Sequence, residues 1–469
     1  MKMSHTFSKN TTGRRFSISG RPLILGTLVL TGTGLITRTI GFFYRIYLSR
    51  LFGEEGMGIY QLLSPVLSLS FSLCAAAYQT AISKYVAEYS ARSTGRFKPL
   101  ITGLIISTPI SVLCTAVIYS QSGFIAENLL LEPRTASMLR ILAFSIPFSS
   151  IHSCINGYFY GIKKTGAPAA AQLLEQLSRV GCVYLVSSSV IAQGKTPSIN
   201  VAVLGLTVGE LVSMLVSLAA IFHVLYSHTA HRIPTGASVR THLYRNRDMF
   251  QSILFMALPL TLNRIVLNLL QSVEAVSIPA RLRVYGYDNA TALSVYGVLT
   301  GMAMPLIFFP NALTNSVSVL LLPLVSENYA LGDIPAVKSA ILRTVKFCAI
   351  LGFICMSTFF LLGNYVGSAL FDSSLAGHFI TTLSFLCPFL YLDATLSSIL
   401  QGLGKAGTIF VMNVIALLLR LVFVFKAIPL FGITGYLWGM LVSQIVLSIL
   451  YLLCLRHFFR HKKEAQRTS

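Results

Sequence analysis

Long hydrophobic stretches separated by short polar segments recur along the whole chain. A helix needs about 20 consecutive apolar residues to cross a bilayer, and stretches of this length run from one end of the sequence to the other. They predict an all-α protein with about twelve membrane-spanning helices. The expected helices cover residues 23–48, 59–82, 99–120, 137–162, 168–192, 199–226, 250–280, 292–325, 342–366, 376–401, 407–430 and 432–458.

A basic segment at residues 1–22 precedes the first of these stretches. The apolar stretch behind it is too long for the core of a signal peptide, and no small-residue cleavage site follows it. We therefore expect residues 23–48 to be retained as the first membrane-spanning helix.

The two halves of the sequence repeat each other at a constant separation of 241 residues. Three pairs share this separation: FSIPF at 144–148 with FLCPF at 385–389, YGIKKTG at 160–166 with QGLGKAG at 401–407, and Arg179 with Arg420. Chance matches rarely keep one register, and internal repeats are common in transporters. Because each half has an even number of expected helices, both halves begin on the same side of the membrane. The repeat therefore predicts two parallel six-helix lobes.

The positive charges show how the chain is oriented and divided. Most of the 36 Lys and Arg residues lie in the N-terminus, the even-numbered loops and the C-terminus, which by the positive-inside rule places both termini in the cytoplasm of a bacterial inner membrane. The net charge of +21 is thus a topology signal and does not indicate a nucleic-acid partner. The expected segments are a basic N-terminus (1–22), an N-lobe (23–226), a basic linker (227–249), a C-lobe (250–458) and a basic C-terminus (459–469).

Sequence signals for an enzyme, a metal site or a cofactor are absent. No loop much exceeds twenty residues, so there is no room for a soluble catalytic domain. Neither a phosphate-binding loop nor an H-E-x-x-H pattern occurs. All eight cysteines fall within expected helices without metal-ligand spacing, so we interpret them as free thiols.

Five arginines fall inside expected helices: Arg38, Arg45, Arg179, Arg264 and Arg420. An Arg at mid-bilayer costs about 2.5–3.5 kcal/mol on insertion scales, so each must reach an interface, form an ion pair or line a hydrated cavity. Arg38 and Arg45 are almost two helical turns apart and share one helix face. Arg45 is also near enough to the outer end to reach the headgroup layer, whereas Arg38 favours a cavity.

Acidic residues in the expected helices offer partners for these arginines. Glu175 precedes Arg179 by four residues, the spacing and order of a helical ion pair, so we interpret that pair as structural. Glu274 is a candidate ion-coupling site, and a salt bridge to Arg38 or Arg264 is the alternative. Two further acids have no partner that the sequence identifies: Glu210 and Asp393.

The use of Arg throughout, with no Lys, indicates the chemistry of the guest. A guanidinium stays charged when desolvated and binds phosphate or carboxylate through two parallel hydrogen bonds. The expected binding residues for such an anion are Arg38, Arg45, Arg179, Arg264 and Arg420, with Asn263 beside Arg264.

The first helices resemble a known family. TRTIGFFYRIYLSRLFGEEGMGIYQLLSP at 37–65, followed by AISKYVAEYSARSTGRF at 81–97, is similar to the stage V sporulation protein B-type polysaccharide biosynthesis proteins of the multidrug/oligosaccharidyl-lipid/polysaccharide (MOP) exporter superfamily. The resemblance implies two six-helix bundles around a central cavity and alternating access that flips a lipid-linked saccharide. Arg38 matches the family's first-helix arginine and Arg45 the arginine of its Tyr-Arg pair. The related lipid II flippases have Arg-Asp there, and many relatives have fourteen helices.

Two functions follow as hypotheses. The first is a flippase for a polyprenyl-pyrophosphate-linked saccharide in cell-wall or polysaccharide biosynthesis. Its expected partners are the lipid-linked saccharide, membrane lipids and cell-envelope biosynthesis proteins. We expect the flippase to be a monomer. The alternative is a drug/cation antiporter of the MATE type, which needs an acidic cavity. A glycosyltransferase would need paired acids on a large outer loop, which is missing. A structural role in a cell-wall complex is left open.

Overall fold

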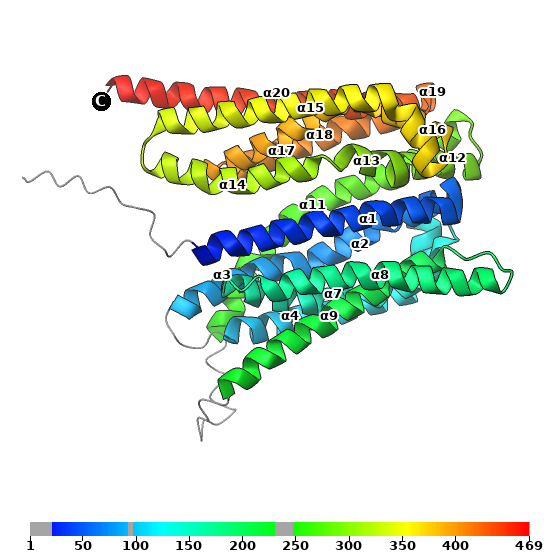
Figure 1. Cartoon of the computed structure of the whole chain (residues 1–469), viewed down its shortest axis with the longest axis horizontal. Coiled ribbons are helices and arrows are strands. Elements are labelled where there is room, and N and C mark those ends of the chain that lie inside the picture. Colours follow the sequence, from blue (N-terminus) through cyan, green and yellow to red (C-terminus); the bar gives the residue numbers. More distant parts are fainter. Residues whose placement is uncertain (1–20, 92–96, 230–246, 469) are drawn as a thin grey trace, which may run out of the picture.

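The computed structural model describes residues 21–91, 97–229 and 247–468. Over these residues the chain is built from helices and turns without a strand, and most helices run side by side along the longest axis of the molecule (Figure 1). Most of the predicted basic segments 1–22 and 227–249 lies outside the described residues, and the boundaries of the two lobes stay a prediction.

The first half of the chain forms the lower group of helices in Figure 1. Its helices are α1 (Arg21–Gln61), α2 (Ser64–Phe71), α3 (Ala77–Ala91), α4 (Lys98–Ser120), α5 (Ser122–Phe124), α6 (Thr135–Ala143), α7 (Ser145–Gly161), α8 (Gly166–Ala192) and α9 (Asn200–Thr229), with π-helical turns η2 (Ser72–Ala76) and η3 (Ile125–Leu129).

The second half forms the upper group. Its helices are α11 (Arg247–Tyr285), α12 (Asn289–Gly297), η4 (Val298–Ala303), α13 (Met304–Phe308), α14 (Asn311–Ala330), α15 (Ile334–Phe371), α16 (Ser374–Leu383), η5 (Ser384–Leu386), α17 (Cys387–Gly402), α18 (Ala406–Lys426), α19 (Ile428–Phe431) and α20 (Ile433–Thr468). We call the end where α1 begins and α20 ends the terminal end, and the opposite end the distal end.

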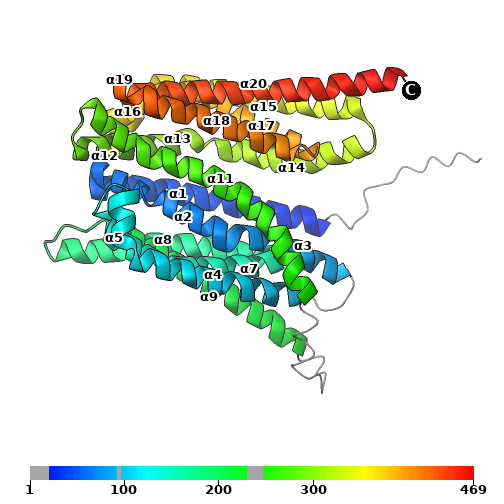
Figure 2. The same cartoon turned by 180° about the vertical axis from the view of Figure 1, so that it is seen from behind.

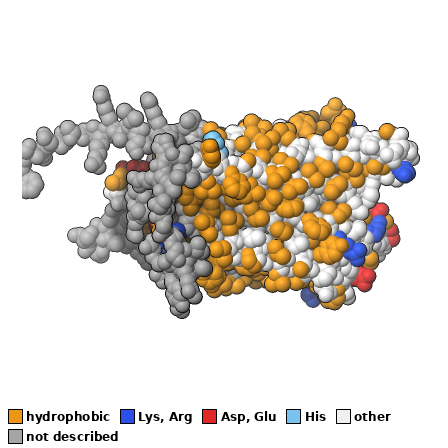
Figure 3. All heavy atoms as spheres, turned by 90° about the horizontal axis from the view of Figure 1, so that it is seen from below, with side chains coloured by type: hydrophobic (Ala, Val, Ile, Leu, Met, Phe, Trp, Pro, Cys, Tyr) orange, Lys and Arg blue, Asp and Glu red, His pale blue; other side chains and the backbone are white. Residues whose placement is uncertain are grey.

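The protein is a multi-pass membrane protein. Ten helical segments among the described residues are long and apolar enough to cross a bilayer. The charged helices α1 and α8 are 41 and 27 residues long and run alongside them. On the face shown in Figure 3, hydrophobic side chains cover the middle of the molecule, while Lys, Arg, Asp and Glu gather at the distal end. The count of twelve spans stays a prediction.

The sequence repeat is also a repeat of local structure. Lys163 and Gly404 occupy matching positions, and both have positive φ angles, 59° and 76°. The amide of Lys163 donates to the carbonyl of Tyr160 at 3.0 Å, and the amide of Gly404 donates to that of Gln401 at 2.9 Å. Equivalent turns therefore follow α7 and α17. Glycine adopts this left-handed conformation without strain, whereas Lys163 does so at a cost.

Helix α11 connects the two halves. Figure 2 shows it crossing from α3 at the terminal end to α12 at the distal end, and it packs against α2 and α3 as well as α18. The Nδ2 atom of Asn268, near its middle, donates to the carbonyl of Ser68 at 3.1 Å and to Oγ of Ser72 at 2.6 Å. Part of this helix thus packs in the first half of the molecule.

Three predicted helices have clearly different bounds in the structure. The expected segment 292–325 is divided by η4 and by a break at Phe309 and Pro310, because proline has no amide hydrogen to continue the helical hydrogen bonds. The first helix extends beyond residue 48 to Gln61 through Gly53, whose φ of 69° kinks it, so the second segment begins at Ser64 and not at 59.

Candidate functional site

Four adjoining cavities run across the molecule: the first two are lined by the first half, the third by both halves and the fourth by the second half. Each neighbouring pair shares lining residues: the first and second share Arg179 and Ser64, the second and third share Arg45, and the third and fourth share Asn311. Together they extend from α7 and α9 in the first half, across α1, to α17 and α18 in the second half.

Arg38 and Arg45 line the third of these cavities. Its volume is about 410 Å³, and α1 provides one wall while Pro305, Phe308 and Asn311 provide the other. Both arginine side chains are exposed, and neither forms an ion pair with a residue that the structure describes. The two guanidinium groups expected to share one face of the first helix therefore lie in the same cavity.

The wall opposite these arginines contains the break in the predicted eighth helix. Helix α14 begins at Asn311, and no side chain caps its N-terminus. The amides at a helix N-terminus carry partial positive charge. The break thus adds a second source of positive potential to the wall that faces α1.

The second cavity holds two hydrogen-bond donors without partners. It has a volume of about 290 Å³ and is lined by Tyr44, Arg45, Tyr60 and Arg179. Tyr44 is only 6% exposed, and its hydroxyl is buried without a hydrogen-bond partner, as is Nε of Arg179. A buried donor without a partner costs about 1–3 kcal/mol. Both donors belong to side chains that line this cavity.

Arg179 also joins a buried polar cluster in the first half. Its Nη2 donates to Oε1 of Glu175 at 2.8 Å, the contact that their spacing predicts. Nearby, Nε2 of His152 on α7 lies 2.9 Å from Oε2 of Glu210 on α9. Arg179 and Glu210 both line the first cavity, of about 360 Å³. His152 as a partner of Glu210 was not predicted, because the two residues lie on different helices and no spacing links them.

Glu274 has a different partner from those predicted. It does not pair with Arg38 or Arg264: its carboxylate accepts from Nη2 of Arg420 and from the Tyr436 hydroxyl, both at 2.8 Å. The reason is that α11 packs against α18, which carries Arg420. Glu274 is 5% exposed. The pair balances its own charge beside the fourth cavity, which Arg420 lines.

The second half has its own buried acid in the fourth cavity, of about 370 Å³. Asp393 accepts hydrogen bonds from Nε2 of Gln444 at 2.5 Å and from Oγ of Ser448 at 2.6 Å. Asp393 occupies the position that corresponds to His152 in the repeat. Each half therefore places a buried ionisable group at the same point of its fourth expected helix.

Arg264 and Asn263 lie apart from the other predicted binding residues. Arg264 lines a separate cavity of about 510 Å³ together with Lys84 and Tyr160, which adjoins the first cavity at Phe71. The structure therefore does not bring Arg264 to Arg38. Asn263 is exposed, and it lines none of the four adjoining cavities described above.

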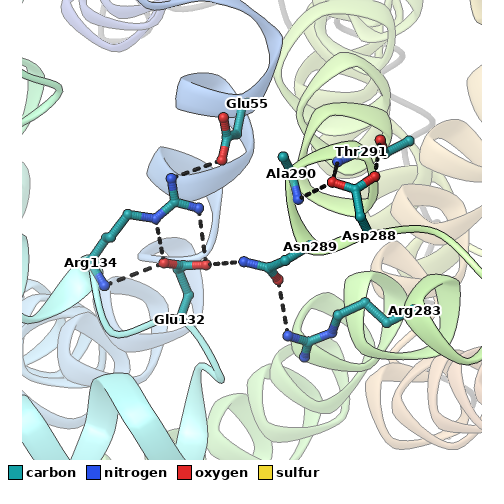
Figure 4. Close-up of polar contacts among 8 residues, drawn as sticks. All are labelled: Glu55, Glu132, Arg134, Arg283, Asp288, Asn289, Ala290 and Thr291. Atoms are coloured by element: carbon teal, nitrogen blue, oxygen red, sulfur yellow. Dashed lines mark hydrogen bonds and ion pairs between the residues drawn. The ribbon is translucent and has the colours of Figure 1, made fainter.

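Polar contacts close the distal end between the two halves (Figure 4). Arg134 lies between two carboxylates, 2.8 Å from Glu55 and 2.6 Å from Glu132. Glu132 in turn accepts from Nδ2 of Asn289, in the second half, at 2.9 Å. Burial alone would raise the pKa of Glu132, but the hydrogen bonds from Arg134 and Asn289 outweigh it and hold the pKa below its usual value. We call these four residues the distal latch.

Two further contacts reinforce the distal latch. Arg50 donates to the carbonyls of Leu370 and Ala369 at 2.9 and 2.7 Å, and Ser373 donates to Glu54 at 2.5 Å. The backbones are also close: a Cβ atom on Gly58 would lie 2.0 Å from the carbonyl oxygen of Leu293. The two halves are thus held tightly together at the distal end.

Sequence comparison relates the chain to two protein families. Residues 23–329 match the family described as polysaccharide biosynthesis protein, and residues 281–425 match the MatE family. Stage V sporulation protein B of Bacillus subtilis (strain 168) is 28% identical over 434 residues, which cover 91% of this chain and 82% of that protein.

Solved structures share the fold at low sequence identity. An inward closed conformation of the lipid II flippase MurJ has a TM-score of 0.69 at 14% identity, covering 92% of this chain and 87% of the other. An inward-facing multidrug resistance MATE family transporter of the MOP superfamily has a TM-score of 0.68 at 16% identity, covering 94% and 99%. The fold is therefore that of the MOP transporters.

Proposed function

The chain belongs to the polysaccharide biosynthesis protein family, and we propose that it is a flippase for a lipid-linked saccharide whose headgroup carries phosphate or pyrophosphate. The comparisons support a membrane transporter of the MOP superfamily. The nature of the cargo is our inference from the cavities.

One observation carries the inference. Arg38 and Arg45 face a cavity between the halves and have no acidic partner among the residues that the structure describes, and the adjoining cavity adds the donors of Tyr44 and Arg179, likewise unpartnered within that part of the chain. Arginine binds phosphate through a planar, bidentate contact and keeps its charge when desolvated. Positive charges that lack a partner inside a membrane protein favour an anionic guest.

The distal latch closes one end of the molecule, so we infer that the headgroup enters from the other end. If the termini are cytoplasmic, as the positive-inside rule predicts, the distal end is the outer end and the arginine cavity is reached from inside. The lipid-linked headgroup enters beside α1, where the exposed arginines bind its phosphate groups. Opening of the latch and closure of the terminal end then release the headgroup on the outer side.

A drug/cation antiporter is the second candidate, supported by the MatE match and the MATE-like fold. Such a protein needs acidic groups that face a cation. Glu274 is already bound by Arg420 and Tyr436, and the arginines of the central cavities repel cations. Asp393 in the fourth cavity is the feature that favours the antiporter.

Reconstituted liposomes distinguish the two candidates. The purified chain is incorporated with a fluorescent polyprenyl-pyrophosphate-linked saccharide, and its transbilayer movement is followed by quenching of the outer leaflet. The flippase proposal predicts movement that falls at least about tenfold in Arg38→Ala. Saturable efflux of a cationic dye without movement of the lipid would favour the antiporter.

Arg264→Ala is the matched control in this assay. It removes the same charge from a cavity apart from the α1 arginines, so movement should stay close to that of the unaltered protein. Equal losses in Arg38→Ala and Arg264→Ala would contradict a binding role specific to the α1 cavity.

A further inference from the structure

Three ionisable side chains from three helices meet behind Arg179. They are His152 on α7, Glu175 on α8 and Glu210 on α9, and each offers an atom within 4.8 Å of the others. Their side chains are 11%, 19% and 17% exposed. The helices that carry them lie next to one another in the first half of the molecule. We call these three residues the histidine cluster.

Further polar groups surround the histidine cluster. Nδ2 of Asn156 lies 3.3 Å from Nδ1 of His152, while Oδ1 of Asn156 is buried without a hydrogen-bond partner. The hydroxyl of Ser213, 1% exposed, faces the carboxylate of Glu175. Apolar side chains would pack better here if the site were only structural, because unpartnered polar groups are costly to bury.

The charges of the cluster do not balance without a proton. Glu175 and Glu210 contribute two negative charges, and Arg179 contributes one positive charge. With His152 neutral, a net negative charge remains inside the membrane, where an uncompensated charge is expensive. One proton, shared between His152 and Glu210 along their 2.9 Å contact, makes the group neutral.

We propose that the histidine cluster is a proton-binding site that holds one exchangeable proton, and that this proton is coupled to anion binding at Arg179. The coupling rests on the proposed function, whereas the proton site itself does not.

A proton fits the geometry better than a metal ion. His and Glu also occur as zinc ligands, but here each has a protein partner: Arg179 binds Glu175 at 2.8 Å, and His152 binds Glu210 directly. The guanidinium would also repel a divalent cation. Among the described residues, the other titratable or charged groups that face this region are Tyr44, Arg45 and Tyr60 on α1, all of them beside Arg179.

Arg179 links the proton site to the anion cavity. Its Nη2 donates to Glu175, and the same side chain lines the cavity of Tyr44 and Arg45. Its Nε has no hydrogen-bond partner among the described residues. An anion bound there competes with Glu175 for the guanidinium. A carboxylate that shares its partner with another anion binds a proton more readily. Anion and proton should therefore bind together, and each should raise the affinity for the other by the same factor.

The first test needs no anion. Infrared difference spectra of the protein in nanodiscs are recorded as the pH is changed, for the unaltered chain and for Glu210→Gln, Glu175→Gln and His152→Gln. We expect a carboxyl band that titrates in the unaltered chain and is lost or shifted in the cluster variants. Glu88→Gln, an exposed carboxylate on α3, and His378→Gln, an exposed histidine on α16, are the controls. Identical titration in all six proteins would overturn the proton site.

The second test measures the coupling with inorganic pyrophosphate as the probe. Proton uptake on binding is read from a pH-indicator dye in weakly buffered solution. Proton uptake should be larger for the unaltered chain than for Glu210→Gln. Protons taken up by the pyrophosphate itself contribute equally to both measurements, so subtracting one from the other cancels them. Thermal unfolding shows whether Glu210→Gln is folded, and His152→Gln takes its place if it is not.

The outcomes of the two tests separate the two proposals. A titrating cluster with pyrophosphate bound but no excess proton uptake overturns the coupling and leaves the anion site. A titrating cluster in a protein that does not bind pyrophosphate leaves the proton site, overturns its coupling and contradicts the proposed function.

Discussion

Tyr44 and Tyr47 differ in how they satisfy their hydroxyl groups, although they lie one turn apart on α1. The hydroxyl of Tyr47 bonds to Oγ of Ser187 at 2.6 Å. That of Tyr44 is buried beside Arg45 and Arg179 without a partner. The first contact is structural, whereas the second group has no hydrogen-bond partner among the described residues.

Tyr44→Phe should therefore weaken pyrophosphate binding without destabilising the fold. Hydrogen bonds to charged groups contribute about 1.5–3 kcal/mol, so we expect affinity to fall about tenfold or more, measured by equilibrium dialysis. Tyr47→Phe removes a hydroxyl from the same helix and should leave affinity unchanged. Unaltered affinity in Tyr44→Phe would show that its hydroxyl does not face the anion.

Glu274 and Arg420 should act as a structural pair. Removing one partner of a buried ion pair typically costs about 3–5 kcal/mol, because the other charge is left alone. We expect Glu274→Gln to lower the thermal unfolding temperature clearly in a detergent that keeps the protein folded. The exposed pair of Lys84 and Glu88 is the comparison, and Glu88→Gln should change the temperature little. Equal effects would mean that Glu274 is not held as the structure indicates.

Single side chains show where sequence reasoning stops. The spacing of Glu175 and Arg179 is enough to predict their contact, because both lie on one helix. The partner of Glu274 depends on how α11 is rotated and on which helix packs against it. The residues near Glu274 in the sequence do not determine either of these. His152 is a lone histidine in an apolar helix, and its repeat position opposite Asp393 was the sole available signal.

At the level of elements, hydrophobic length predicts where helices lie but not how they are interrupted. The breaks at Gly53 and at Phe309 and Pro310 occur where α1 and α13 approach each other's half of the molecule. A glycine or proline within an apolar stretch marks a place where a helix can bend, but tertiary packing decides whether it does. The break at Phe309 and Pro310 lies in the wall of the cavity that Arg38 and Arg45 line.

Gly58 tests the close contact between α1 and α12. A methyl group there would lie 2.0 Å from the carbonyl oxygen of Leu293, so Gly58→Ala must push the two helices apart. We expect the distal end to open, seen as a longer distance between spin labels on the two halves by pulsed electron resonance. Gly34→Ala, at a position of α1 with open space, is the control. An unchanged distance in Gly58→Ala would show that the contact does not hold the distal end closed.

At the level of the whole molecule, the two halves meet closely at the distal end, and adjoining cavities run from one half into the other. The repeat predicted two similar halves, and matched turns at Lys163 and Gly404 agree with it. The distal latch was not predictable, because its members come from loops and helix ends whose meeting depends on the complete fold.

The distal latch should respond to acid. The pKa of Glu132 is below its usual value in the closed state, so its ionised form stabilises the latch above the ordinary pKa of a glutamate, about 4.3. That stabilisation is lost as the pH falls through the lowered pKa. Spin-label distances across the distal end should stay constant from pH 7 to 5 and lengthen only below about pH 4. Glu132→Gln should lengthen them at every pH, and a pH-independent distance identical in both proteins would contradict this role.

Preference for a phosphorylated lipid head over a neutral one is the most direct measure of what the arginine cavity recognises. Native mass spectrometry of the protein, given equal amounts of a polyprenyl pyrophosphate and the matching polyprenol, reports both bound species at once. We expect the pyrophosphate to bind at least about tenfold more tightly, a difference of about 1.4 kcal/mol, and Arg45→Gln to remove most of that preference. Equal binding of the two lipids, or a preference unchanged in Arg45→Gln, would contradict the anionic cargo.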